Sequence, residues 1–324
     1  MTIRRVPATV VTGFLGAGKT TFVNHLLNCS RERRIGIVVN EFGDIGIDGE
    51  LIVAEENAIV EISNGCVCCT VRGDLVTSIV TLLDRYGNDL DHLIVETSGL
   101  ADPAPVLQTF LADAGLRERV ELNSVVVLVD ALHAQEQLND DIASEQVAVG
   151  DRIVLNKTRE ASPEAVDALC TRLRQLNPAA TIDLTNHAKV DADSLFSRRT
   201  FSIDHLLSVE PDLLTGDDHD HEHDTRVQSC GFRFPEPLDA ARFERWANQL
   251  VQRRGASLLR MKGVLNLNGE GRRVIFHSVH MLMETRFDRP WNRDVLRETR
   301  FVVIGRDLDV GEIGEGLRAC AAAI

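Results

Sequence analysis

Three cysteines lie within four positions of the segment NGCVCC, at Cys66, Cys68 and Cys69. Thiolates bind borderline metal ions, and Zn²⁺ accepts them tetrahedrally at about 2.3 Å. Cys66 and Cys69 also have the C-x-x-C spacing of a redox pair, and buried structural thiols are a third interpretation. A disulfide between the two adjacent cysteines would strain the peptide. We therefore predict a metal site whose three thiolates leave one coordination position open, which suits transfer better than a permanent structural zinc site closed by four protein ligands.

A glycine-rich segment, GFLGAGKT, matches the P-loop pattern G-x-x-x-x-G-K-[ST] between an apolar run and a helix-forming stretch. Such loops turn backbone amides onto phosphate oxygens, the lysine contacts the β and γ phosphates, and the hydroxyl binds Mg²⁺. A chance match in a strand-to-helix turn is the alternative. The sequence predicts a nucleotide site in which Thr20 binds Mg²⁺ and the phosphate-binding residues are Gly13, Gly16, Ala17, Gly18 and Lys19.

The segment HLIVETSG places an acidic residue and a glycine after another apolar run. P-loop enzymes hold Mg²⁺ near such an acidic residue and bring such a glycine close to the γ-phosphate. Glu96 is therefore predicted to bind Mg²⁺ through water, with Gly99 near the γ-phosphate. Asp130, at the end of VVVLVD, is open to a similar role or to a simple strand end. No glutamine is evident that would orient the attacking water, so we expect slow hydrolysis, with catalysis by Glu96, Lys19 and Thr20.

The segment NKTR, residues 156–159, follows a further apolar run where guanine-binding P-loop proteins carry N-K-x-D. We expect Asn156 to contact the edge of the base and the stem of Lys157 to cover its face. Arg159 replaces the aspartate that would accept hydrogen bonds from the guanine N1 and N2 groups, and Glu160 could reach the base only from another direction. The sequence therefore predicts nucleotide binding but not strict selectivity for guanine.

The segment GDDHDHEHD, residues 216–224, alternates imidazoles with carboxylates at His219, His221 and His223. Imidazole favours Zn²⁺, Ni²⁺, Co²⁺ and Cu²⁺. A segment this polar cannot build a hydrophobic core. It is either a weak accessory metal site or a solvated acidic linker, and we favour the metal site.

The elements that must position these residues follow from the apolar runs. Up to about residue 200, six β-branched runs alternate with amphipathic stretches: ATVVTG, IGIVVN, AIVEIS, HLIVET, SVVVLVD and DRIVLNK. Runs that are apolar on both sides suit buried parallel strands joined by helices. Later runs, RVQSCGFRF, ASLLRMKGVLNLNG, RRVIFHSVHMLM and TRFVVIGRDL, indicate a mostly antiparallel sheet. We predict an α/β P-loop NTPase domain with a mostly parallel sheet at 1–205, a His/Asp-rich linker at 206–225 and a smaller α+β domain at 226–324.

The length and the net charge of the chain limit the kinds of ligand and partner that we expect for it. The chain of 324 residues suffices for one large and one small domain. Its formal net charge of −14 disfavours nucleic-acid backbones and anionic lipid and suits a cationic ligand. No apolar stretch reaches the length of a membrane span or of a signal-peptide core. We therefore expect a cytoplasmic protein with reduced cysteines and with neither nucleic-acid nor membrane partners.

The motifs GFLGAGKT, NEFG, GCVCC, ETSG and NKT, followed by the histidine-rich segment, RMKGVL and DRPW, occur in one order along the chain. In this order the sequence resembles the CobW/YjiA family of P-loop GTPases over nearly its whole length. The resemblance implies GTP and Mg²⁺ as cofactors and nucleotide contacts that extend to Thr21. It further implies a site for Zn²⁺, or alternatively Co²⁺ or Ni²⁺, with the ligands Cys66, Cys68 and Cys69.

Two carboxylates, Glu41 and Asp44, lie in the stretch that resembles the first switch, and they are candidate ligands for Mg²⁺ or the transported metal. The resemblance implies a GTP-hydrolysing metallochaperone that couples nucleotide state to transfer of Zn²⁺ to an unidentified client metalloprotein, and a homo-oligomer is compatible with it. Two alternatives stay open. One is a factor that inserts cobalt into cobalamin or a cobalt enzyme, and the other is a nucleotide-gated zinc sensor or store without a client.

Overall fold

The computed structural model describes residues 4–42, 58–65, 71–87, 89–196, 227–292 and 296–322, with the backbone alone for 40–42, 58–65 and 71–74. The chain divides into two compact units, Met1–Cys170 with Ala180–Phe201, and Thr171–Ala179 with Ser202–Ile324. The boundaries predicted at 205 and 226 lie outside the described residues. Among the described residues, every helix is too short or too polar to span a bilayer.

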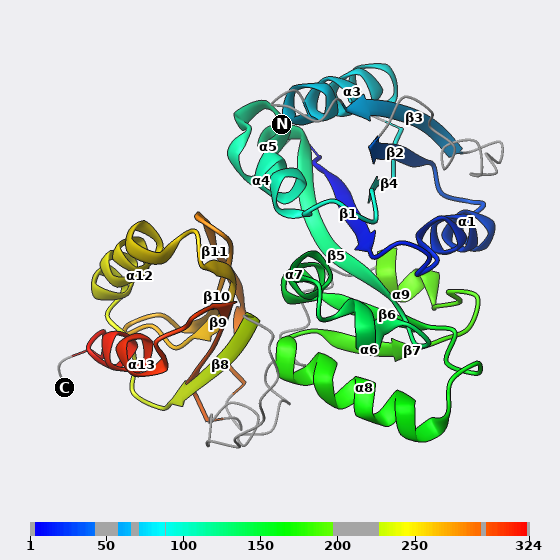
Figure 1. Cartoon of the computed structure of the whole chain (residues 1–324). Coiled ribbons are helices and arrows are strands. Elements are labelled where there is room, and N and C mark those ends of the chain that lie inside the picture. The colour runs from blue at the N-terminus through cyan, green and yellow to red at the C-terminus, as the bar shows by residue number, and fades with distance from the viewer. Residues whose placement is uncertain are drawn as a thin grey trace. The chain divides into compact units, whose positions relative to one another are not determined.

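The first unit is built on a seven-stranded sheet in the order β3-β2-β4-β1-β5-β6-β7 (Figure 1). Every pair of neighbouring strands is parallel, as predicted. Described helices lie between β1 and β2 and between successive strands from β3 to β7, and they return the chain to the same end of the sheet. The strands are β1 Val6–Gly13, β2 Ile35–Phe42, β3 Ala58–Gly65, β4 His92–Thr97, β5 Val120–Asp130, β6 Arg152–Asn156 and β7 Thr181–Leu184.

Helices cover both faces of this sheet. The helices are α1 Lys19–Cys29, α3 Val71–Tyr86, α4 Ala104–Ala112, α5 Ala114–Arg119, α6 Ala134–Gln137, α7 Asp141–Val149, α8 Pro163–Leu176 and α9 Ala192–Phe196. Right-handed crossovers place α1 on one face and the helices from α3 to α8 on the other, and Figure 1 shows α1 and α7 on opposite sides. On α1 the buried stripe of Phe22, Val23 and Leu26 packs on the sheet.

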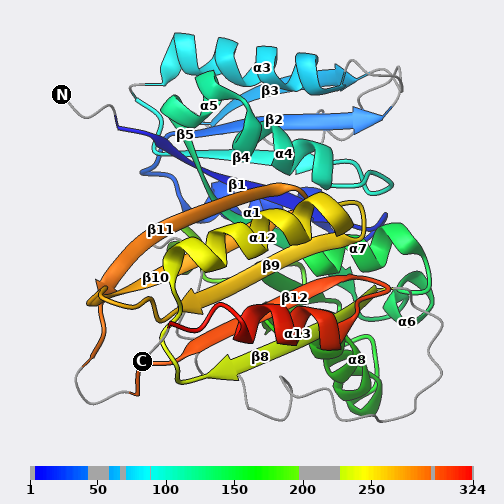
Figure 2. The same ribbon diagram turned by 90° about the vertical axis from the view of Figure 1, so that its left-hand side faces the viewer.

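The second unit is a five-stranded antiparallel sheet in the order β11-β10-β9-β12-β8. Its elements are β8 Val227–Phe234, α12 Ala240–Arg254, β9 Leu258–Leu265, β10 Arg272–Val279, β11 Leu282–Pro290, β12 Thr299–Arg306 and α13 Val310–Arg318. Figure 2 shows α12 and α13 on the same face of this sheet. The core between them contains the aromatic residues Phe243, Trp246, Phe276 and Phe301.

Two strands were not predicted from the sequence. Strand β7 is short and carries partly exposed side chains at the end of the sheet, so it lacks the apolar run that marks the other six. The run RRVIFHSVHMLM is not one strand, because β10 ends at Val279 and β11 begins at Leu282. The turn between them uses His280 at φ +48°, where a glycine or asparagine would have signalled a hairpin.

Candidate functional site

The P-loop follows β1 at the carboxyl edge of the parallel sheet. Gly13 has φ +136°, and a Cβ there would lie 2.3 Å from the carbonyl oxygen of Leu128 on β5. Gly18 has φ +101° and N-caps α1 with no side-chain hydrogen bond. A Cβ on Gly18 would lie 2.6 Å from Nδ2 of Asn156. Both positions therefore require glycine. Because Gly18 has no side chain that could cap α1, the N-terminal end of this helix can bind an anion.

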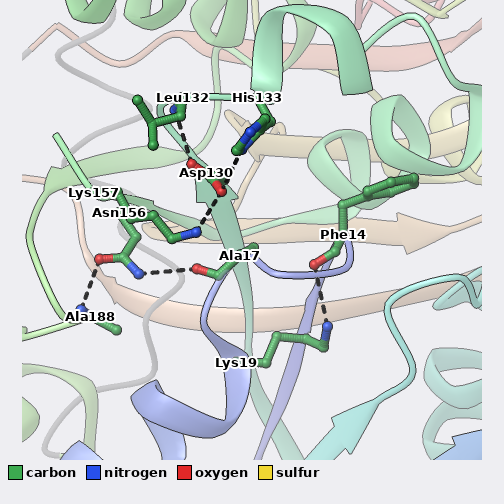
Figure 3. Close-up of polar contacts among 9 residues, drawn as sticks. All are labelled: Phe14, Ala17, Lys19, Asp130, Leu132, His133, Asn156, Lys157 and Ala188. Carbon is green, nitrogen blue, oxygen red and sulfur yellow. Dashed lines mark hydrogen bonds and ion pairs between the residues drawn. The ribbon is translucent and has the colours of Figure 1, made fainter. Parts of the chain in front are cut away.

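Lys19 places its charge at the centre of the loop. Its side chain is buried, and Nζ donates to the carbonyl oxygen of Gly13 at 2.9 Å. It also donates to that of Phe14 at 3.4 Å (Figure 3). A buried ammonium has a strong electrostatic preference for an anion. The predicted phosphate contact of Lys19 fits this geometry.

The two residues predicted to bind Mg²⁺ meet although they are 76 positions apart. Thr20 Oγ1 donates to Glu96 Oε1 at 3.2 Å, and Glu96, near the end of β4, is 2% exposed. A hydroxyl and a carboxylate are hard oxygen donors of the kind that Mg²⁺ prefers. The donor set at the start of α1 and the end of β4 therefore fits this ion.

Gly99, in the loop after β4, packs directly against the P-loop. A Cβ at this position would lie 2.8 Å from the backbone nitrogen of Leu15 and 2.9 Å from Nζ of Lys19. Only a glycine permits this approach. The predicted position of Gly99 beside the phosphate-binding residues fits the geometry.

Asn156, at the end of β6, joins two loops through its amide. Its Nδ2 donates to the carbonyl oxygen of Ala17 at 3.0 Å, and its Oδ1 accepts from the backbone N–H of Ala188 at 2.9 Å (Figure 3). The side chain is 3% exposed. Asn156 therefore fixes the P-loop relative to the loop after β7, a role that the sequence did not reveal, and its contact with a base stays a prediction.

Lys157 is held by an acidic residue from the neighbouring strand. Its backbone has φ +60°, and its Nζ lies 2.7 Å from Oδ2 of Asp130, which is 2% exposed (Figure 3). His133 Nδ1 lies 3.0 Å from the same oxygen, and Leu132 N–H donates to Oδ1 at 2.9 Å. Burial alone would raise the pKa of Asp130, but the hydrogen bonds from Lys157, His133 and Leu132 outweigh it and hold the pKa below its usual value. Asp130, left open by the sequence, is thus an ionised partner of Lys157.

Arg159 occupies the position of the missing guanine-binding aspartate, and its side chain is exposed. Its backbone N–H donates to Oδ1 of Asn186 at 2.9 Å. In the same loop, His187 and Ala188 have φ of +54° and +53°. Left-handed backbone at non-glycine residues concentrates at functional sites. The loop after β7 therefore belongs to this end of the site, and the absence of glycine there explains why the sequence did not mark it.

Most of the predicted metal ligands lie outside the described residues: Asp44, Cys66, Cys68, Cys69, His219, His221 and His223. Glu41 lies on β2, where it pairs with Asn64 of β3, and the next pair is Phe42 with Gly65. Strands β2 and β3 therefore end side by side, and Gly65 is the residue covalently bonded to Cys66. Within the described ranges, His, Cys, Asp and Glu form no group of three or more that could hold a metal.

Other cysteines within the described ranges have a different character. Burial raises the pKa of Cys230 to about 12 and that of Cys320 to about 11, so both are neutral thiols at pH 7. Cys170 is also buried, whereas Cys29 is exposed on α1. Metal ligation requires a thiolate. Cys230 and Cys320 both belong to the hydrophobic core of the second unit and are structural residues there.

Comparison with known proteins covers both units. Residues 7–183 match the model of the CobW/HypB/UreG nucleotide-binding domain, and residues 227–321 match the CobW C-terminal domain of cobalamin synthesis proteins. The chain is 36% identical over 313 residues to the zinc chaperone YjiA of Escherichia coli, covering 95% of this chain and 96% of that protein. It is 33% identical over 363 residues to the zinc chaperone CobW of Pseudomonas aeruginosa, covering 99% and 93%.

A solved structure has the same architecture. The crystal structure of Zn(II)-bound YjiA GTPase from E. coli superimposes with a TM-score of 0.74 at 30% sequence identity. The match covers 99% of this chain and 100% of that one. The parallel P-loop unit and the antiparallel second unit are therefore both shared with that structure.

Proposed function

This chain belongs to the CobW/HypB/UreG family of P-loop GTPases, and we propose that it is a metallochaperone that uses GTP to control transfer of Zn²⁺ to a client metalloprotein. The proposed zinc ligands are Cys66, Cys68 and Cys69, with Glu41 and Asp44 as neighbouring carboxylates. The names of two relatives, both zinc chaperones, support Zn²⁺ over Co²⁺ or Ni²⁺. We propose a cytoplasmic location because reducing conditions keep such thiols available for metal.

One observation carries this proposal: the cysteine segment begins at the edge of the sheet that holds the P-loop. In a parallel sheet all carboxyl ends lie at one edge, where ligands bind. Gly13 ends β1, Thr97 ends β4 and Phe42 ends β2, and Phe42 pairs with Gly65. Gly65, the residue before Cys66 in the sequence, therefore lies at the same end of the sheet as the P-loop, three strands from β1, and this placement supports coupling of the two sites.

The described side chains suggest how the nucleotide end works. Lys19 would neutralise the β and γ phosphates, and the uncapped amides at the start of α1 would bind their oxygens. Thr20 and Glu96 would hold Mg²⁺, which neutralises phosphate charge. Lys157, fixed by Asp130, would cover the face of the base. We propose that the γ-phosphate orders the segment that begins at Glu41, and that its loss on hydrolysis releases the zinc ligands.

The test is the zinc affinity of wild-type protein and of Cys68→Ala, each with GDP and with a non-hydrolysable GTP analogue. Wild type should bind Zn²⁺ with different affinities in the two nucleotide states. Cys68→Ala should weaken zinc binding by more than about 100-fold, since even residues that only support a metal ligand contribute roughly 10- to 100-fold. GTP affinity without metal should not change.

A matched control is Cys29→Ala, which removes an exposed thiol of α1. It should leave zinc affinity at the wild-type value. Equal zinc affinities of wild type and Cys68→Ala, each with GDP and with the GTP analogue, would refute a carrier whose zinc binding depends on nucleotide. A redox pair would instead make Cys66 and Cys69 important and Cys68 dispensable, because only the first two have the C-x-x-C spacing.

A further inference from the structure

A buried glutamine holds the loop that carries Gly99. Gln146 lies on α7, 47 positions from Gly99, and is 1% exposed. Its Nε2 donates to the carbonyl oxygens of Gly99 at 3.3 Å and Ala101 at 3.1 Å. A primary amide has two N–H groups, so both hydrogen bonds can form at once.

The loop held by Gln146 is in direct contact with the phosphate-binding residues. The close approach of Gly99 to the Leu15 backbone and the Lys19 ammonium means that a shift of this loop must disturb the P-loop. A trans peptide keeps its N–H opposite its C=O, so fixing the carbonyl of Gly99 also fixes the direction of the Leu100 N–H. Gln146 thus sets the orientation of a peptide group beside the site.

The outer side of the same loop is open to solvent. Leu100 is 53% exposed, and Ala101 N–H closes a turn onto the carbonyl oxygen of Ser98 at 3.2 Å. Gln146 bonds to the loop from the buried side, where α7 packs against β1 and β5. The amide is therefore placed to hold the loop at one distance from the P-loop.

We propose that Gln146 is a positioning residue for GTP hydrolysis that holds the Gly99 loop where it can meet the γ-phosphate. This inference rests on the proposed place of Gly99 beside that phosphate. GDP has no γ-phosphate, so loss of the Gln146 hydrogen bonds should slow hydrolysis and leave GDP affinity unchanged. A displacement of about 1 Å in a positioning group can reduce a rate by about 100-fold.

The experiment measures kcat for GTP hydrolysis, without added zinc, for wild type, Gln146→Glu and Gln146→Met. The pH range runs from about 5.5 to about 8.5, because a buried carboxyl group can titrate near neutral pH. An ionised glutamate has the shape of glutamine but no donor, whereas a protonated one has a single O–H donor. Burial raises a carboxyl pKa. The kcat of Gln146→Glu divided by that of wild type should therefore be about 0.01 at high pH and should rise as pH falls. Gln146→Met should stay slow throughout.

The control is Gln137→Glu, which adds the same charge at a half-buried residue beside the same small cavity, lined by Phe14, Gln137 and Gln146 among others. The hydrogen bonds to Gly99 and Ala101 come from Gln146. The kcat of this variant divided by that of wild type should not change with pH. If Gln146→Met fails to fold, as judged by circular dichroism, the pH profile of Gln146→Glu decides alone. A flat profile for Gln146→Glu, or a wild-type rate at all pH values, overturns the inference.

The outcomes separate this inference from the proposed function. A slow, pH-dependent Gln146→Glu enzyme together with nucleotide-independent zinc binding would contradict the carrier and support the positioning role. If zinc affinity depended on the bound nucleotide and Gln146→Glu hydrolysed GTP at the wild-type rate, the carrier would be supported and the positioning role contradicted. No hydrolysis by the wild-type chain would overturn both.

Discussion

At the residue scale, the base end of the site combines a conventional asparagine and lysine with an unconventional arginine. Asn156 is tied to Ala17 and Ala188, and Lys157 is tied to Asp130, so both side chains are held in place. In the predicted base contact, the Arg159 guanidinium would present donors to the N1 and N2 groups of guanine, which are donors themselves. The position of Arg159 should therefore decide how strongly the chain prefers guanine.

Changing Arg159 to aspartate should sharpen the preference for GTP over ATP. A charge-assisted hydrogen bond contributes about 1.5 to 3 kcal/mol, so the gain should be roughly 10- to 150-fold. Competition binding of GTP and ATP to both proteins measures it. The control Arg117→Asp makes the same charge change at an exposed position on α5. An unchanged preference in Arg159→Asp would show that this residue does not face the base.

The sequence predicts those candidate site residues that lie within one motif. The P-loop, Glu96 and the N-K pair are contiguous patterns with a fixed place after a strand, so their spacing predicts their chemistry. Asp130 with Lys157, Asn156 with Ala188 and Gln146 with Gly99 are contacts between residues 27 to 47 positions apart. No local pattern records such pairs, because they depend on which strands become neighbours in the sheet.

At the element scale, most strands could be predicted because a strand buried on both faces must be apolar along its length. Helix α3, Val71–Tyr86, likewise has its buried residues Leu75, Ile79 and Leu82 at helical spacing. The strands that were missed, β7 and β11, carry partly exposed side chains, so their composition resembles that of loops. Strands β7 and β11 are specified by their pairing with β6 and β10, which the chain shows only after folding.

Gly13→Ala should destabilise the first unit where β1 meets β5. Its φ of +136° strains any side chain, and the added Cβ would lie 2.3 Å from Leu128 O. Strain and overpacking of this kind cost roughly 1–3 kcal/mol each. Denaturant unfolding without nucleotide measures the loss, and Gly16→Ala, with φ +75° and nothing within 4 Å, is the control that retains only the strain. Equal losses in the two variants would show that β5 yields to the Cβ.

At the scale of the whole molecule, two units are joined through a segment that is rich in histidine and acid. The family matches end at residue 183 and resume at 227, so the histidines at 219, 221 and 223 fall between them. The relatives from E. coli and P. aeruginosa are matched over 96% and 93% of their length. The arrangement of one GTPase unit followed by a second unit is therefore shared with these two relatives. The histidine segment is a feature to test by itself.

Deleting residues 217 to 224 should remove weakly held metal ions and leave the tight one in place. A polar chain must give up conformational entropy of about 1–2 kcal/mol per residue to surround a metal, so each imidazole gains little affinity. The cysteines at 66, 68 and 69 bind Zn²⁺ as anionic thiolates, whereas the imidazoles bind it as neutral ligands. Isothermal titration with Zn²⁺ counts both classes of site. A control that changes His219, His221 and His223 to asparagine keeps the length of the segment and should match the deletion. If either variant lost the tight site and kept the weak ones, the histidines would be the principal ligands and the cysteines would need another role.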